Sequence, residues 1–148
     1  MKRIQNYKEV FEVEGPLVLK DLKTKYRNLV KEFHPDKFLD NDEKEAAEIK
    51  STKIIDGYHF LVSIAPQTKE ANLEAYNETL TEYKVADWYH KSMLLEITFT
   101  DGNTYEYFGV NKILFGKFIN AKSINNFGKR NIFNSFLYRK SKKAAVTV

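Results

Sequence analysis

Apolar and polar residues follow a helical rhythm in the first half of the chain. Between residues 19 and 33 the apolar side chains recur three and four positions apart, which predicts an amphipathic helix with one buried stripe. Pro16 suits the first turn of a helix, where its missing N–H is not needed, so we expect the helix to start beside it. Pro35 ends the helix, because the residue before a proline is pushed away from helical geometry.

Further helices are expected on both sides of this one. Residues 45–63 carry the same spacing and predict a second long helix, which an acidic loop over residues 39–43 joins to the first. Two helices joined by so short a loop are expected to pack antiparallel. Residues 67–84 predict a third helix, and residues 7–13 a short helix or turn.

The pattern changes near Ala86. Two β-rich runs, residues 94–100 and 104–110, flank Asp101 and Gly102. This pair tolerates the positive φ angles of tight turns, so the segment predicts a β-hairpin.

After the hairpin, residues 112–121 have helical spacing, and the aromatic-rich residues 131–139 fit either a last strand, which we prefer, or a short helix. The predicted fold class is therefore α+β. We expect an antiparallel helical domain over residues 1–82, a small domain of a β-hairpin and a helix over residues 83–140, and a disordered tail over residues 141–148.

Positive charge is concentrated in the C-terminal third of the chain. Of the 24 basic and 20 acidic residues, residues 94–148 hold nine basic and three acidic ones. Such a surface attracts phosphates or an acidic partner, although an ordinary solvated face has the same composition.

Several classes of protein are disfavoured by composition. Cysteine is absent, which excludes disulfides and thiolate metal sites. The N-terminal residues lack the apolar run of a secretory signal, and no stretch approaches the roughly 18 apolar residues of a membrane span. We therefore expect a cytoplasmic protein with no membrane contact and no cofactor. No Ser/His/Asp set, Gly-rich phosphate loop or carboxylate pair is visible, so we expect a binding protein and not an enzyme.

The helix over residues 19–33 also has a charged face. Four cations, here called the basic ridge, fall three or four positions apart on its outside: Lys20, Lys23, Arg27 and Lys31. Just past the helix, Pro35 stiffens the chain and holds His34 and Asp36 in a loop of limited freedom. These three residues are called the corner. A ridge that leads into a rigid, charged corner suits docking on another protein, whereas the ridge alone would be an ordinary solvated face.

At these residues the chain resembles a known family. The run LKDLKTKYRNLVKEFHPDKF resembles helix II and the His-Pro-Asp loop of a J domain, NYKEVFEV is similar to that family's first helix, and EIKSTKIIDGYHFLVS is similar to its helix III. The resemblance implies a DnaJ-type co-chaperone that docks on a DnaK-type heat-shock chaperone and stimulates its ATPase. The residues implied in this contact are Lys23, Tyr26, Arg27, Lys31, His34, Pro35 and Asp36, with Asp36 as the charge that meets an arginine of the partner.

The chain departs from the J-domain pattern in three places. Glu12 stands where the family's first helix often ends in glycine, and the loop after Lys37 is a few residues longer. The acidic stretch PQTKEANLEAYNETL replaces the basic start of the usual fourth helix. The choice of partner chaperone therefore stays open.

A second resemblance covers residues 93–139. It is carried by a strand, the segment after it and a helix end, Tyr105-Glu106-Tyr107, Phe108-Gly109-Val110 and Ala121-Lys122-Ser123. Together they resemble the KTSC domain, a small module built around a YxY strand. This module occurs alone in bacterial proteins and at the C-terminus of some lysyl-tRNA synthetases, and RNA binding has been suggested for it.

Tyr105 and Tyr107 lie two residues apart and therefore on one face of the strand. Exposed tyrosines would stack on unpaired bases, at about 1 to 3 kcal/mol each, while nearby cations neutralise phosphates. Alternatively, the two rings form the core against which a helix packs. The candidate RNA-binding residues are Tyr105, Tyr107, Lys112, Lys117, Lys122 and Arg130, with Lys129 and Arg139 as further cations.

The sequence thus predicts a J-domain co-chaperone whose C-terminal module serves for targeting or binds a client protein or RNA. Two other classes stay open: an RNA-binding (tRNA-binding) protein acting through the basic C-terminal domain, and a protein-interaction module without chaperone activity. Tyr26 and Tyr58 could be core residues. His34 and Asp36 could be metal ligands, although no third ligand has suitable spacing. The sequence does not determine the oligomeric state.

Overall fold

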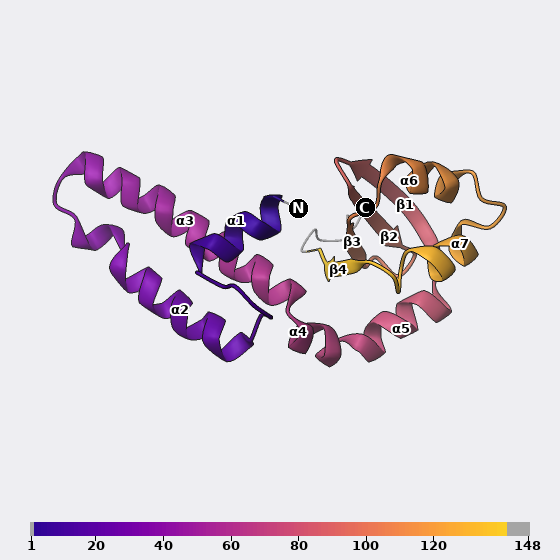
Figure 1. The fold of residues 1–148 in the computed structure, drawn as a ribbon, viewed down its shortest axis with the longest axis horizontal. Helices are drawn as coiled ribbons and strands as arrows, with labels where there is room; N and C mark the ends of the chain where they lie inside the picture. The colour runs from indigo at the N-terminus through magenta and orange to yellow at the C-terminus, as the bar shows by residue number, and fades with distance from the viewer. Residues whose placement is uncertain (1, 142–148) are drawn as a thin grey trace. The chain divides into compact units, whose positions relative to one another are not determined.

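The chain forms two compact units, Met1–Glu70 and Ala71–Val148. The computed structural model describes residues 2–141, so the tail expected over residues 141–148 lies outside the described residues except for Ser141. The first unit is helical and the second contains a four-stranded antiparallel sheet (Figure 1). The predicted α+β class is confirmed.

The first unit is built on two long antiparallel helices. Figure 1 shows α2 and α3 side by side, with α1 lying along α3. The antiparallel pair expected from the short connecting loop is confirmed. The elements of this unit are α1 (Lys2–Val10), α2 (Leu19–Glu32), the one-turn 3-10 helix η1 (Pro35–Lys37), α3 (Asn41–Ile64) and α4 (Pro66–Ala71).

α2 begins at Leu19, where the spacing predicted it, but Pro16 lies before the helix and not in its first turn. Val18, which precedes it, provides no side-chain cap. Instead, the Leu19 N–H donates to Oε1 of Gln67 in α4 at a distance of 2.8 Å. Gln67, which is distant in sequence, therefore accepts a hydrogen bond from a free N–H group at the helix N-terminus, the role that an N-cap side chain normally has.

A residue that is not glycine ends α1 in the left-handed region, since Glu12 has a φ of 53°. The Val13 N–H donates to the carbonyl oxygen of Lys8 at 2.9 Å. The Glu12 N–H donates to that of Glu9 at 3.1 Å, which completes a Schellman motif. Because this conformation costs a residue with a Cβ about 1 to 2 kcal/mol, glycine would suit the position better.

α1 and α3 approach closely at Gly57. A Cβ atom on Gly57 would lie 2.8 Å from Cδ1 of Tyr7 and 3.2 Å from Cε2 of Phe11, so the packing requires glycine here. The ring of Tyr7 also lies 5.3 Å from that of Phe60. The largest buried side chains of the unit belong to Phe11, Leu22, Ile54, Phe60 and Leu61.

The second unit is a sheet in the order β1-β2-β3-β4 with helices packed on one face. Its elements are α5 (Leu73–Glu82), β1 (Val85–Lys91), β2 (Leu94–Phe99), β3 (Thr104–Phe108), α6 (Lys112–Ile119), α7 (Ile124–Asn131) and β4 (Leu137–Lys140). The core combines rings and aliphatic chains from the helices and strands: Tyr76, Leu80, Leu95, Ile97, Phe99, Tyr105, Tyr107, Val110, Phe118, Ile132, Phe133 and Tyr138.

The two hairpin turns explain which strands the sequence revealed. The predicted β2–β3 hairpin is confirmed, and Gly102 adopts a φ of 89° in its turn. β1 was not predicted. Its turn to β2 consists of Ser92 and Met93, with φ angles of 48° and 70°, where hairpins of this kind usually have Asn-Gly or Asp-Gly.

The single helix expected over residues 67–84 is wrong, because Asn72 interrupts it between α4 and α5. Tyr76 and Leu80 of α5 belong to the core of the sheet. The second unit therefore begins at Ala71, earlier than the boundary at residue 83 expected from the sequence.

The aromatic segment over residues 131–139 is only partly a strand. Its first residue ends α7, which was not predicted, and only Leu137 onward forms β4. Gly128 lets α7 approach the core, since a Cβ there would lie 2.3 Å from Cζ of Phe133. Ile132 and Phe133 fill the core from the turn between α7 and β4.

Candidate functional site

The basic ridge and the corner are exposed in the first unit. All four ridge residues of α2 have exposed side chains. The side chain of His34 is 50% exposed and that of Asp36 83%, whereas Pro35 is partly buried. Figure 1 shows the turn that carries the corner at the end of the α2–α3 pair. The ridge thus runs along α2 directly into the corner.

η1 makes the corner a single hydrogen-bonded turn. His34 has extended backbone, with φ of −64° and ψ of 129°, as expected before a proline. Its Nδ1 accepts a hydrogen bond from the Asp36 N–H at 3.2 Å, and the Lys37 N–H donates to its carbonyl oxygen at 3.0 Å. Since Nδ1 is the acceptor, the proton of the neutral ring lies on Nε2. His34 therefore fixes the turn and leaves the Asp36 carboxylate exposed.

Tyr26 links the ridge to α3. Its ring stacks on Tyr58 with centroids 4.1 Å apart and planes 13° from parallel, and both side chains are partly buried. At the C-terminal end of α2, Lys50 of α3 lies with its Nζ 5.5 Å from the ring centre of Phe33. These contacts hold the ridge-bearing helix in one orientation, so Tyr26 contributes to packing as well as to the surface.

Leu39 was not among the predicted contact residues. It follows η1, and its side chain is 100% exposed, next to the corner. The signal in the sequence was a leucine within an otherwise polar and acidic loop. An apolar side chain beside a charged corner adds area that a docked protein can cover.

Tyr105 and Tyr107 are core residues, so the alternative of a packed core is confirmed and the exposure needed for base stacking is not found. They are 4% and 0% exposed. Tyr105 meets Tyr76 edge-on at 4.9 Å, and Tyr107 lies 5.3 Å from the ring of Phe133. Helices cover the sheet face on which both rings lie, which is why two tyrosines at strand spacing pack instead of stacking on a ligand.

The hydroxyl groups of this core are hydrogen-bonded. Tyr76 donates to the carbonyl oxygen of Phe133 at 2.6 Å, and the hydroxyl oxygens of Tyr76 and Tyr107 lie 2.7 Å apart. A carbonyl cannot donate, so Tyr107 is the donor to Tyr76. Burial raises the pKa of both tyrosines well above 10.0, and it raises the pKa of Tyr138 to about 12.

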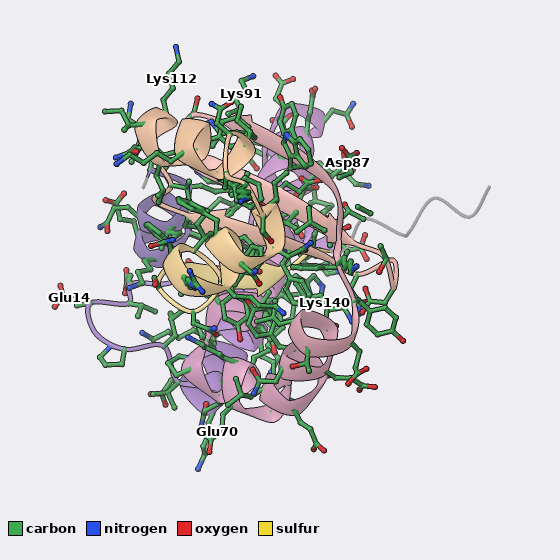
Figure 2. All side chains as sticks on the ribbon, turned by 90° about the vertical axis from the view of Figure 1, so that its right-hand side faces the viewer. Glu14, Glu70, Asp87, Lys91, Lys112 and Lys140 are labelled. Atoms are coloured by element: carbon green, nitrogen blue, oxygen red, sulfur yellow. The ribbon has the colours of Figure 1, made fainter. Side chains whose placement is uncertain are left out.

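The cations of the second unit are exposed, with one exception. Lys112, Lys117, Lys122, Lys129 and Arg130 have exposed side chains on or beside α6 and α7, and Lys112 extends away from α6 in Figure 2. Arg139, in contrast, is 7% exposed and forms a buried ion pair with Glu106. Its predicted contact with phosphate is therefore wrong, because the charge is already paired inside the sheet.

Neither a metal centre nor a membrane span is found in the described part of the chain. No group of three or more His, Cys, Asp or Glu side chains within residues 2–141 could hold a metal ion. Within these residues, His34 and Asp36 are not part of such a group. Over the same residues, every helix is too short or too polar to cross a bilayer.

Comparison with known families identifies the second unit. Residues 82–136 match the KTSC domain family, which confirms the resemblance carried by the YxY strand. α5 lies almost entirely outside the matched residues, yet it contributes Tyr76 and Leu80 to the core. The chain therefore contains a KTSC domain, and the helix before the matched residues contributes to the core of the same unit.

The first unit has a more distant relative. The DnaJ protein homolog XDJ1 of Saccharomyces cerevisiae is 33% identical over 70 residues in the N-terminal part of the chain. The match covers 47% of this chain but 15% of the yeast protein. The J-domain family itself gives no match, and no solved structure matches the chain.

Proposed function

We propose that the first unit is a J domain that docks on a DnaK-type heat-shock ATPase and stimulates ATP hydrolysis there. The observation that carries the proposal is the exposed basic ridge leading into the rigid corner. The similarity to a yeast DnaJ homolog supports it. In this role the chain binds and regulates another protein's active site, and it needs no catalytic residue or cofactor of its own.

The ridge would orient the encounter with an acidic surface of the ATPase. Its four cations lie along one side of α2, and the stacking of Tyr26 on Tyr58 holds that side outward. Charges at the rim of an interface chiefly raise the association rate, and salt screens them. We therefore expect docking to weaken as ionic strength rises.

The corner would make the specific contact. Its backbone is fixed by Pro35 and by the hydrogen bond from the Asp36 N–H to Nδ1 of His34, so little conformational entropy is lost on binding. The exposed Asp36 carboxylate can accept a bidentate pair of hydrogen bonds from an arginine. Leu39 would add apolar contact beside it.

The steady-state ATPase rate of a DnaK-type chaperone, titrated with this protein, tests the docking surface. Wild type is expected to raise the rate to a plateau. Arg27→Glu places a negative charge in the ridge, so the half-saturating concentration is expected to rise at least about tenfold. The matched control is Lys53→Glu, which reverses an exposed lysine on α3 outside the ridge and is expected to leave the titration unchanged. Equal effects of the two reversals would contradict docking through the ridge.

The KTSC domain would serve as the targeting unit, and one observation favours RNA as its ligand. Between Gly109 and Ser141 the sequence has no acidic residue, and its lysines on α6 and α7 are exposed. When such a surface neutralises the phosphates of a nucleic acid, counterions are released from them. The affinity therefore falls steeply as the salt concentration rises. Lys129→Ala is expected to lower the slope of log affinity against log salt by about 1 for single-stranded RNA. Lys53→Ala is expected to leave this slope unchanged. A slope near zero for the wild-type protein would exclude RNA binding through the phosphates.

A further inference from the structure

β1 is an edge strand with one side open. Among residues 2–141 it pairs with β2 alone. A two-residue turn joins the strands, so Lys91 and Leu94, which flank it, form a hydrogen-bonded pair. Because hydrogen-bonded pairs alternate along an antiparallel ladder, Asp87, Tyr89 and Lys91 direct their backbone groups to β2. The N–H and C=O groups of Trp88 and His90 therefore point away from the sheet, toward the open side.

Two large aromatic side chains lie on this strand. Trp88 is 39% exposed and Tyr89 57%, on opposite faces because they are adjacent. Trp88 meets Phe118 of α6 edge-on at 6.2 Å, and the next residue of that helix, Ile119, is 38% exposed. Aromatic residues are enriched in protein interfaces, and an open strand that carries them favours the addition of another strand.

The side chains of β1 are complementary to a second β1 in the antiparallel direction. Asp87 lies two residues before Tyr89 and Lys91 two residues after it, and both charged side chains are exposed on one face. Figure 2 shows both at the margin of the second unit. We propose that β1 pairs antiparallel with β1 of a second copy of this chain, with Tyr89 on the two-fold axis. Asp87 then faces Lys91 of the second copy at two symmetric positions.

The backbone of β1 fits the same register. Trp88 faces His90 of the second copy, and these are the residues whose backbone groups point outward. In the single chain the Trp88 N–H donates to Oδ1 of Asp87 at 2.8 Å, which satisfies the edge amide. Pairing replaces that bond with one to the His90 carbonyl of the second copy and frees the carboxylate for the lysine. A bulge between Val85 and Asp87 limits the pairing to residues 87–91.

Sedimentation velocity of the full chain over a range of concentrations tests the pairing. Wild type is expected to shift from monomer to dimer as concentration rises. Asp87→Lys and Lys91→Asp each place like charges opposite each other at two positions, so each is expected to weaken the dimer about tenfold. The double variant restores both opposite pairs and is expected to regain the wild-type affinity. Lys140→Asp, a reversal on the other edge strand, is the matched control and is expected to have no effect.

The absence of cysteine allows an independent test of the register. Tyr89→Cys would place two thiols at the symmetric position, where Cα atoms of a non-hydrogen-bonded pair lie about 4.5 Å apart. That separation suits a disulfide, so mild oxidation is expected to give a covalent dimer. Tyr83→Cys, at a tyrosine that is 40% exposed outside β1, is expected to give no covalent dimer under the same conditions.

Four results would overturn the proposal, and the first three concern the chain alone. They are a wild-type chain that stays monomeric at every concentration, a folded double variant that dimerises no better than the single variants, and equal crosslinking of Tyr83→Cys and Tyr89→Cys. Binding of an extended peptide from another protein to β1 of a chain that stays monomeric would also overturn it. Circular dichroism spectra identify any variant that fails to fold, and the cysteine pair remains informative if a charge variant does.

Discussion

The hydroxyl groups of Tyr76 and Tyr107 form a hydrogen-bonded chain to the Phe133 carbonyl, so their removal is expected to have unequal costs. Tyr107→Phe removes the last donor of the chain and leaves Tyr76 still bonded to the carbonyl. The cost is one net hydrogen bond, about 0.5 to 1.5 kcal/mol. Tyr76→Phe leaves two buried groups without this partner, the Tyr107 hydroxyl and the Phe133 carbonyl. At about 1 to 3 kcal/mol for each, it is expected to cost about 2 to 6 kcal/mol.

Urea denaturation measures both costs with the protein's own reporter. Trp88 is the single tryptophan and lies in the same unit, so its fluorescence follows the unfolding of the KTSC domain. The two substitutions remove the same atom from side chains that are 1% and 0% exposed, and each is the control for the other. Equal costs, or a larger cost for Tyr107→Phe, would contradict the direction of the hydrogen bonds and the assignment of these tyrosines to the core.

Three further predictions concern stability. Glu12→Gly is expected to stabilise the first unit by about 0.5 to 1 kcal/mol in chemical denaturation, because glycine relieves the left-handed strain; Glu14→Gly, a loop position without positive φ, is expected to give no gain. Gly128→Ala is expected to lower the thermal midpoint of the second unit, since its Cβ would meet an aromatic ring at 2.3 Å, whereas Gly116→Ala in open space is expected to raise it. Burial raises the pKa of Tyr138 in the folded protein to about 12 from 10.0. Stability that is complete below pH 10.0 is therefore expected to fall as pH rises through about 12, and tyrosinate absorbance that rises fully at pH 10.0 in the native protein would contradict this.

The elements that could be predicted are those whose pattern lies within one short stretch of the sequence. Three- and four-residue spacing predicted α2 and α3, and Gly102 predicted the β2–β3 turn. β1 was missed because Ser92 and Met93 reach positive φ without the glycine or asparagine that usually marks such a turn. The pairing of β1 with β2 compensates for the strain of these positive φ angles, and a short stretch of sequence does not reveal that pairing.

The same distinction holds for the candidate site. The ridge and the corner could be predicted because both arise from neighbouring residues of one helix and one turn. The burial of Tyr105 and Tyr107 depends on α5 and α7, which come from other parts of the sequence and cover the sheet. Arg139 likewise looked like a surface cation until the register of β3 and β4 placed it opposite Glu106. Burial that depends on contacts between distant segments could not be predicted from the periodicity of the sequence.

Single-turnover ATP hydrolysis by a DnaK-type chaperone from the same organism tests the central claim most directly. ATP is bound to the chaperone in advance, and hydrolysis is followed with wild-type protein and with His34→Gln. The substitution removes the Nδ1 acceptor that fixes the Asp36 N–H but leaves the basic ridge intact. The account predicts clear acceleration by wild type and none by His34→Gln. Equal rates with wild type, with His34→Gln and with no added protein would contradict it, provided that an authentic J protein accelerates hydrolysis in the same assay.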